Sequence, residues 1–274
     1  MNENNAEKVN EDLIELQKKF SNFLNEIVTT NIENKIGSDS ANQKLAYDSM
    51  SKFLKDLPEN EYLNLNFASH NNYHYDIYDY VFINFNYTSL LDNYIYLDKL
   101  QFDPHPYKRA DRNFMFYPNP NGYGNFKDRN EDTSYSTYLH TSVLHPHGKQ
   151  SIARSLLFGT NDSNLKEGLE VFNKEYWVQY QIYYEPLIKE TELFIIYGSS
   201  IGNADSWWWR NICKRIATGK AELIVYSYKK SFNKKKFIDD YGDNLDLENR
   251  IFVVEDDGNT DLMFLHLPNA HKKF

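Results

Sequence analysis

The chain has 274 residues, of which 41% are hydrophobic and 25% are charged, a balance that is ordinary for a globular protein and excludes a disordered chain. The net charge of −9 disfavours sequence-independent nucleic-acid binding, because neutralising phosphates requires a positive surface. No apolar run approaches the roughly 20 residues that a membrane-spanning helix needs.

The cysteine content and the N-terminus indicate the compartment. Cys213 is the only cysteine, which excludes an intramolecular disulfide and fits a reducing environment. The first twelve residues are polar and acidic, unlike a signal peptide. We therefore expect a cytoplasmic protein without a membrane partner. The lysine-rich stretch at 229–236 is interpreted as a solvated loop.

Residues 1–58 have the pattern of a helical segment. Apolar residues recur at three- and four-residue steps from Leu13 to Ile27, which predicts a helix over 11–28. A second helix is predicted over 41–56, because Pro58 cannot continue it. Between the two, residues 37–40 (Gly-Ser-Asp-Ser) have the composition of a turn.

From residue 80 onward, predicted strands alternate with predicted helices. This order favours an α/β fold with an open, mostly parallel sheet and helices on both faces. We expect one α/β domain over 1–274, in which the segment 101–137, rich in Pro, Asn, Gly and Tyr, is a long insertion loop. The predicted strands are residues 80–86, 138–145, 156–158, 192–197, 221–227 and 250–254, and the predicted helices are residues 88–99, 168–190 and 205–217.

The first strand ends in Phe85-Asn86-Tyr87-Thr88. Asn tolerates left-handed backbone geometry, so Asn86 could simply turn the chain and cap the next helix with the help of Thr88. Alternatively, the Asn86 amide, which both donates and accepts hydrogen bonds, could bind a ligand hydroxyl or position a water molecule. The residue type is compatible with both interpretations.

The second strand is followed by His147-Gly148. A histidine at a strand end can act as a general base near neutral pH, and Gly148 would let a ligand approach the backbone closely. The alternative is a half-buried loop histidine without a chemical role. His140 and His145 lie nearby, but a single distant cysteine and the lack of a His-Glu-x-x-His helix argue against zinc.

The strand at 192–197 leads into a glycine-containing loop, Gly198-Ser199-Ser200-Ile201-Gly202. Exposed donors in such a loop could hold a ribose or a phosphate. Asp205 is the expected N-cap of the following helix, and its negative charge favours ribose hydroxyls over phosphate. An ordinary strand-to-helix turn is the alternative.

The same loop also matches Gly-x-Ser-x-Gly, the nucleophile elbow of α/β hydrolases, with Ser200 as the nucleophile. Asp257 and His266 follow in the order that this fold requires. An elbow, however, runs directly into its helix, whereas here residues 202–204 intervene. A serine hydrolase is therefore the third choice.

Three consecutive tryptophans, Trp207-Trp208-Trp209, open the helix predicted at 205–217. Successive helical residues are rotated by about 100°, so the three indoles should not all face one core. Burial on two sides is the simpler expectation, and the alternative is that one indole lines a groove.

Taken together, the motifs Phe85-Asn86-Tyr87-Thr88, His147-Gly148 and Gly198-Ser199-Ser200 with Asp205 resemble those of the AbiH family of bacterial abortive-infection proteins over roughly residues 1–230. That family is more distantly similar to sirtuin-like domains, whose Rossmann-type fold binds NAD. The resemblance implies a bacteriophage-defence protein that binds or hydrolyses NAD without a metal.

The resemblance also implies roles for particular residues. In a reaction of the NAD glycohydrolase type, Asn86 would orient the ribose or the attacking water and His147 would assist as base. Gly198 and Ser199 would contact the ribose on the adenine side. The same comparison places the remaining ligand contacts at Tyr87, Thr88, Gly148, Ser200 and Asp205.

Two departures from the pattern favour a second hypothesis. Thr88 stands where sirtuin-like domains commonly have Asp, and the N-terminal Gly-Asn-Gly-Phe-Asp-like loop of the family does not occur in this sequence. We expect a missing N-terminal segment, and the alternative is a shortened, inert member of the family. The alternative function is a non-catalytic module that senses a phage product. The partners expected are a nucleotide, a phage protein as trigger and a second copy of the chain.

Overall fold

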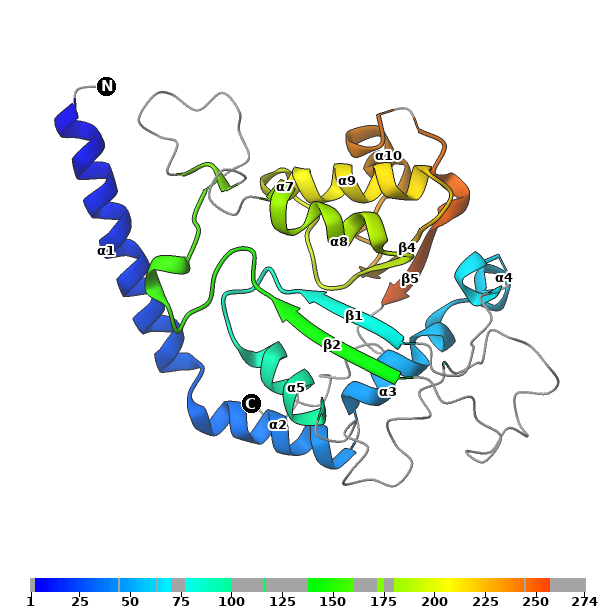
Figure 1. Ribbon diagram of the computed structural model, residues 1–274, viewed down its shortest axis with the longest axis horizontal. Helices are drawn as coiled ribbons and strands as arrows, with labels where there is room; N and C mark the ends of the chain where they lie inside the picture. Colours follow the sequence, from blue (N-terminus) through cyan, green and yellow to red (C-terminus); the bar gives the residue numbers. More distant parts are fainter. Residues whose placement is uncertain are drawn as a thin grey trace.

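The computed structural model describes residues 3–43, 45–62, 64–69, 77–99, 116, 138–159, 172–174, 180–243 and 245–256 (Figure 1). It confirms a mixed α/β protein in which the strands run parallel. The predicted insertion loop at 101–137 lies outside the described residues except for Phe116. In the part of the chain that is described, no helix has the length and apolar character to cross a membrane.

The described strands form two parallel sheets. In the first, β1 (Ile77–Ile83) pairs with β2 (Tyr138–Leu144), so that Phe82 lies opposite Val143. In the second, the order is β3 (Leu193–Ile196), β4 (Glu222–Tyr228) and β5 (Ile251–Asp256). The strand predicted at 156–158 is wrong, because these residues have no regular structure.

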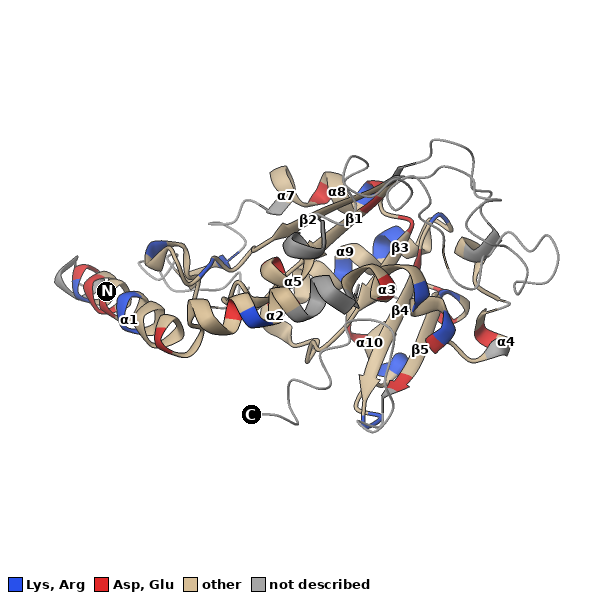
Figure 2. Cartoon of the chain, turned by 90° about the horizontal axis from the view of Figure 1, so that it is seen from below, with Lys and Arg blue, Asp and Glu red and all other residues tan. Residues whose placement is uncertain are grey.

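The N-terminal segment is helical, as predicted. The helix α1 (Glu3–Ile27) precedes α2 (Thr30–Gln43) and α3 (Leu45–Lys52), which continues into the 3-10 helix η1 (Phe53–Asp56). The turn predicted at 37–40 is wrong, because α2 runs through it. Along α1, acidic and basic residues are interspersed (Figure 2), and Lys19 pairs with Glu15 at 2.7 Å.

The remaining helices connect the strands. Of the helix predicted at 168–190, residues 180–190 are described throughout, and they form α7 and α8, whereas residues 168–171 and 175–179 lie outside the described residues. These helices are α4 (Glu59–Tyr62), α5 (Leu90–Lys99), α7 (Tyr180–Tyr183), α8 (Glu185–Glu190), α9 (Ser206–Ala217) and α10 (Lys234–Tyr241), and the short 3-10 turns are η2 (Asn66–Ser69), η5 (Ala153–Ser155), η7 (Asn203–Asp205) and η8 (Glu248–Arg250).

Two apolar cores lie on opposite faces of the strands. Successive strand side chains point to opposite faces, so alternate residues enter each core. Ile195 and Ile224 belong to the core shared with α3 and α5, whereas Ile196 and Val225 belong to the core shared with α8, α9 and α10. Residues of β1 contribute to both cores as well, and helices therefore cover both faces (Figure 1).

The three tryptophans are all buried, in the core beneath α8, α9 and α10. Trp207 and Trp208 contact each other edge to face, with ring centroids 5.2 Å apart. Trp208 also contacts Tyr184, which precedes α8, and Phe85, which follows β1. The indoles can share one core because aromatic residues from several elements surround α9.

The helix α1 packs against the chain that follows β2. The buried Gln17 amide donates a hydrogen bond to the Leu156 carbonyl at 2.7 Å, and the Ser21 hydroxyl donates to the Gln150 carbonyl at 2.6 Å. The Phe20 ring packs edge to face on Phe158. These contacts fix the loop after β2, which carries one of the predicted motifs.

Candidate functional site at the carboxyl ends of the strands

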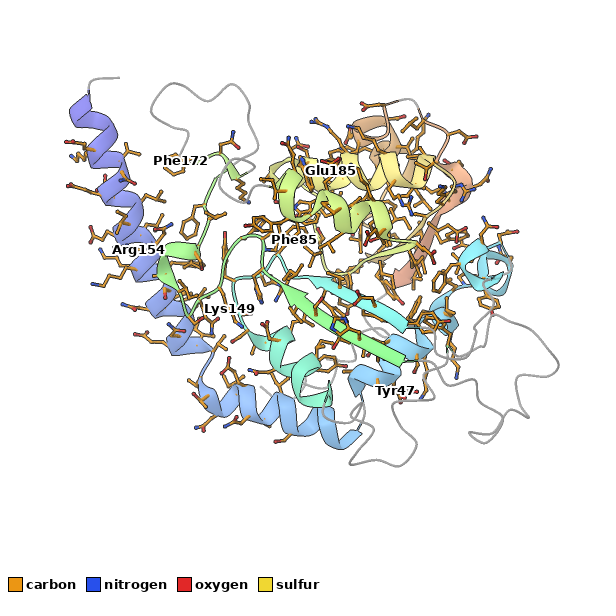
Figure 3. The ribbon with its side chains drawn as sticks, viewed as in Figure 1. Tyr47, Phe85, Lys149, Arg154, Phe172 and Glu185 are labelled. Carbon is orange, nitrogen blue, oxygen red and sulfur yellow. The ribbon has the colours of Figure 1, made fainter. Side chains whose placement is uncertain are left out.

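An aromatic contact joins two of the predicted motifs. The Phe85 ring, which follows β1, lies 5.2 Å from the His147 ring, which follows β2, and 5.9 Å from the Trp209 ring of α9, measured between centroids. Figure 3 shows Phe85 between the ends of β1 and β2 and the helices above them. The sheet ends and the start of α9 therefore meet at one place.

At the centre of this region, a histidine lies against a carboxylate. The His147 Nε2 and the Asp205 Oδ1 are 2.9 Å apart, and the His147 residue is only 4% exposed. The Lys174 Nζ, which is also buried, lies 3.6 Å from the same carboxylate oxygen. The His147–Asp205 distance is that of an ion pair, but the contact lacks hydrogen-bond alignment, so neither atom has an aligned partner among the described residues.

The charge of Asp205 follows from these neighbours. Burial raises the pKa of the Asp205 carboxyl, but the interactions of the carboxylate with His147 and, secondarily, with Lys174 outweigh burial, so the net pKa is lowered from its ordinary value. The carboxylate is therefore ionised at neutral pH and can hold the His147 imidazole in one orientation.

Asp205 was predicted to cap the helix that follows it. It does occupy the N-cap position of α9, but its side chain makes no capping hydrogen bond. A missing cap typically costs about 1 kcal/mol of stability. The Asp205 carboxylate contacts His147 and Lys174 instead, so its side chain interacts with these two residues and not with the N-terminus of α9.

Tyr87 lies on the other side of the histidine. Its ring is 6.3 Å from that of His147, and its hydroxyl donates to the Leu157 carbonyl at 2.8 Å. Burial, and secondarily the charge of Asp205, raise the pKa of Tyr87. The Gln150 backbone N–H donates to the Tyr87 carbonyl at 2.8 Å, while the buried Gln150 Oε1 has no hydrogen-bond partner among the described residues.

The turn after β1 is made by Asn84 rather than by Asn86. The buried Asn84 side chain accepts a hydrogen bond from the Asn86 N–H at 3.0 Å and donates one to the Thr88 carbonyl at 3.3 Å. The helix α5 starts only at Leu90. Asn86 is exposed, so its amide is available to a ligand. The turn-forming role that the sequence suggested for Asn86 is performed by Asn84.

A second charged cluster holds the Asn86 turn, and sequence reasoning missed its partners. The His145 Nε2 lies 2.8 Å from Asp92 Oδ2, and its Nδ1 lies 3.3 Å from the Asn86 carbonyl. The Lys149 Nζ is 2.7 Å from the other Asp92 oxygen. Burial raises the pKa of Asp92, but His145 and Lys149 outweigh burial and lower it overall. The sequence signal for this cluster was a charged residue, Asp92, in the first turns of the helix predicted at 88–99.

These histidine contacts bear on metal binding. His140 pairs with Asp79 at 2.7 Å near the surface, and His145 and His147 each face a different carboxylate. Across the described ranges, no three His, Cys, Asp or Glu side chains are grouped so that they could hold a metal ion.

Gly148 is required by the protein's own packing. Its φ is +88°, and a Cβ at this position would lie 1.8 Å from the Ser155 carbonyl oxygen. The sequence suggested that Gly148 lets a ligand come close to its backbone, but the space beside Gly148 is occupied by Ser155 of η5.

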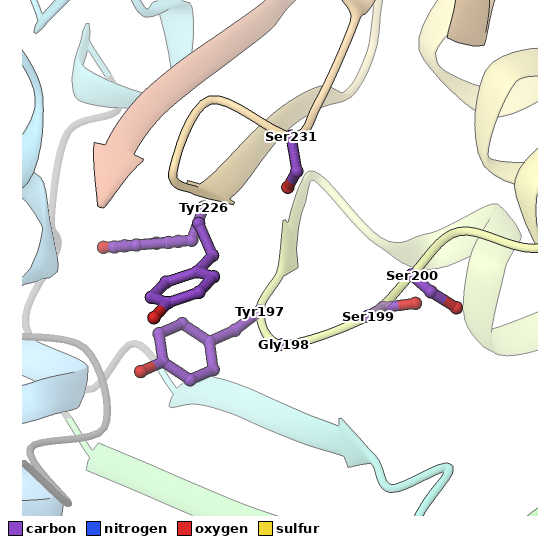
Figure 4. Close-up of a pocket in the computed structure, with 7 residues that line it drawn as sticks. Tyr197, Gly198, Ser199, Ser200, Tyr226 and Ser231 are labelled. Atoms are coloured by element: carbon purple, nitrogen blue, oxygen red, sulfur yellow. The ribbon is translucent and has the colours of Figure 1, made fainter. Parts of the chain in front are cut away.

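A cavity opens at the carboxyl ends of β3 and β4 (Figure 4). Its volume is about 320 Å³, and Gly198, with φ of +64°, has open space where a Cβ would be. The cavity is lined by Tyr197, Gly198, Ser199, Ser200, Tyr226, Tyr228 and Ser231. Three of the predicted ligand residues thus line a cavity, which we call the β3–β4 cavity.

The loop that forms one wall of the cavity is strained. Ile201 has φ of +50°, an uncommon value for a β-branched residue, and its N–H is bonded to the Ser199 hydroxyl at 3.1 Å. The loop then passes through Gly202 and η7 before α9 begins at Ser206, unlike a nucleophile elbow. Asp257 and His266, the partners of a hydrolase, lie outside the described residues.

The two loop glycines should respond differently to alanine. For Gly198→Ala we expect a loss of about 1–2 kcal/mol from the left-handed backbone alone. For Gly148→Ala we expect a loss of about 3 kcal/mol or more, because the clash with Ser155 adds an overpacking penalty. Urea unfolding of both variants measures the difference, and equal losses would contradict the packing that we describe.

The His147–Asp205 pair should appear in the pH dependence of stability. Because the pKa of Asp205 is lowered in the folded state, its contribution is complete above the ordinary aspartate pKa of about 3.9 and is lost as pH falls through the lower, folded value. Asp205→Asn should therefore cost roughly 1–3 kcal/mol at pH 6–7, the usual cost of leaving a buried polar group such as the His147 imidazole without its partner.

The same measurement at pH 3 should give a smaller difference between Asp205→Asn and the natural chain. Asp246→Asn, which changes an exposed loop residue in the same way, serves as the control and should remain within about 0.5 kcal/mol at either pH. A difference for Asp205→Asn that stays constant down to pH 3 would show that the carboxylate does not stabilise the fold by its charge.

Comparison with known proteins adds the family. Neither curated proteins nor solved structures gave a significant match to the chain. Residues 1–228, however, match the family described as "Bacteriophage abortive infection AbiH", and this range contains all three strand-end motifs. The chain therefore belongs to the AbiH family of bacteriophage abortive-infection proteins.

Proposed function

We propose that this AbiH protein acts in the cytoplasm and contributes to abortive infection by binding NAD at the carboxyl ends of its parallel strands and hydrolysing the bond between nicotinamide and ribose. In open α/β sheets, ligands bind beyond the carboxyl ends of the strands. Both apolar cores include residues of both sheets, which supports a single Rossmann-like, sirtuin-like layer.

The buried His147–Asp205 pair is the observation that carries this proposal. An ionised carboxylate 2.9 Å from Nε2 fixes the orientation of the imidazole, so that Nδ1 can face a substrate. In the reaction, the oxygen of a water molecule attacks C1′ of the ribose while the bond from C1′ to the nicotinamide nitrogen breaks. Nicotinamide leaves as a neutral molecule, and the proton of the water passes to Nδ1 of His147.

Asn86 would contribute from the neighbouring strand end. Its exposed amide can accept a hydrogen bond from the attacking water or donate one to a ribose hydroxyl. Its backbone is fixed from two sides, by the Asn84 side chain at its N–H and by the His145 imidazole at its carbonyl. Such fixation is what a positioning residue needs, since misplacement by about 1 Å can cost two orders of magnitude in rate.

One observation favours a second candidate, a non-catalytic module that senses a phage product. His147 is 4% exposed and is covered by the Phe85 and Tyr87 rings, so a substrate reaches it only if these rings move. In that case the pair would hold the strand ends together, and ligand binding would be read out by a partner.

The proposal is tested in infected cells with three variants. His147→Gln removes the base, Asn86→Ala removes the amide, and His140→Gln is the matched control, because His140 is an exposed histidine on β2. A positioned general base contributes roughly 10²–10⁴-fold in rate. We expect NAD to fall after infection with the natural chain and with His140→Gln, and to stay level with His147→Gln and Asn86→Ala, with phage protection lost in parallel.

The same experiment separates the two candidates. If NAD stays level in cells that the natural chain protects, the hydrolase proposal is wrong. If, in addition, Asn86→Ala abolishes protection, the sensing module is the better account.

A further inference from the structure

The turn after β4 has an unusual backbone. Lys229 and Lys230 have φ of +48° and +57°, and the Ser231 N–H donates to the Tyr228 carbonyl at 3.0 Å, which closes a four-residue turn. A turn with two left-handed central residues favours Asn-Gly, since these residues tolerate positive φ. Two lysines are poor choices for this backbone, so the turn conformation does not explain them.

This turn borders the β3–β4 cavity. Tyr228 and Ser231, on either side of the lysines, line the cavity, and the Lys229 Nζ lies 5.0 Å from the centroid of the Tyr228 ring. Lys230 pairs with Glu255 at 3.5 Å, whereas Lys229 forms no ion pair with a described residue. A cation on a strained backbone, without an ion-pair partner among the described residues, therefore lies between two residues that line the cavity.

The lining of the cavity complements this charge. Its polar groups are the hydroxyls of three serines and three tyrosines, and none of the lining residues is a carboxylate. A dinucleotide fold that binds an unmodified ribose usually places a carboxylate on the 2′-hydroxyl, whereas a basic residue accommodates a phosphate there. Asp205, whose charge suggested ribose hydroxyls, is not a lining residue and is paired with His147 and Lys174.

We propose that the β3–β4 cavity selects a nucleotide whose ribose carries a phosphate monoester, with the Lys229 ammonium and the Ser231 hydroxyl as the phosphate partners. The tyrosines at 197, 226 and 228 supply the aromatic surface for the base. A volume of about 320 Å³ lies at the lower end of the range of ligand pockets, which suits one nucleotide half rather than a whole dinucleotide. This inference rests on the proposed function, because it takes from that function the assumption that the ligand is a nucleotide.

For a dinucleotide substrate, the consequence is a preference for NADP over NAD. The phosphorylated ribose would lie at β3 and β4, and the nicotinamide half would extend toward the ends of β1 and β2. The basic residues interpreted from sequence as a solvated loop would then include one that determines specificity, at position 229.

The test is calorimetric titration of the full chain with adenosine, 2′-AMP, 3′-AMP, 5′-AMP, NAD and NADP. We expect one of the ribose-phosphorylated adenosines to bind at least about 10-fold more tightly than adenosine, and NADP more tightly than NAD if that phosphate is at the 2′ position. Raising the salt concentration from 50 to 300 mM should weaken the phosphorylated ligands selectively, because salt screens exposed charges.

Three variants connect the preference to the lysine. Lys229→Asn removes the charge with a residue that tolerates the left-handed backbone, so the fold should be preserved. It should reduce the preference for the phosphorylated ligand to less than about 3-fold. Lys229→Arg should retain the preference, and Lys235→Ala, which removes an exposed lysine from α10, should leave all affinities unchanged.

The outcomes separate this inference from the proposed function. Equal affinity for adenosine and its phosphates, or an unchanged preference in Lys229→Asn, would overturn the phosphate site while leaving nucleotide binding intact. If no nucleotide binds at millimolar concentration, both the phosphate site and the NAD proposal are wrong.

Discussion

The structure depends on the carboxylate of Asp205, which contacts His147 instead of capping the helix that it begins. Asp205 begins α9 yet leaves the helix end uncapped, and it faces His147 at the end of β2 and Lys174 instead. A buried charge without a partner is costly, so each member of the pair constrains the other. Because Phe85 packs on both His147 and the tryptophans of α9, this constraint ties the end of β1 to the same point. Three chain segments that are distant in sequence are thereby held together.

Around this point the molecule divides its polar chemistry between two places. The His147–Asp205 pair, of which His147 is buried, suits proton transfer. The β3–β4 cavity is open and lined by hydroxyls and aromatic rings, and it suits recognition. A dinucleotide has the corresponding division between a reactive nicotinamide half and an adenine half that only binds. The strained backbone at Ile201 and at Lys229 lies beside the recognition part, where strain at ligand sites is commonly found.

Much of the fold follows from hydrophobic periodicity, and the errors have physical causes. The pattern correctly predicted helical structure before residue 58 and β3, β4 and β5 at nearly their observed positions. The pattern wrongly predicted a turn at Gly37, where α2 continues. The neighbouring Ile36 packs against the core shared with α3 and α5, so tertiary contacts outweigh the low helix propensity of glycine. The pattern also wrongly predicted a strand at 156–158, where the Leu156 carbonyl and the Phe158 ring contact α1. The pairing of Asp205 with His147 and that of His145 with Asp92 could not be predicted, because each joins residues more than fifty positions apart.

The account is tested most directly by following the isotope of the attacking water. Protein recovered from infected cells would be incubated with NADP and with NAD in water enriched in oxygen-18, and the products analysed by mass spectrometry. The account predicts free nicotinamide and a phosphorylated ADP-ribose that carries one oxygen-18 at C1′, formed by the natural chain and not by His147→Gln. Recovery of both dinucleotides intact with the natural chain would contradict it.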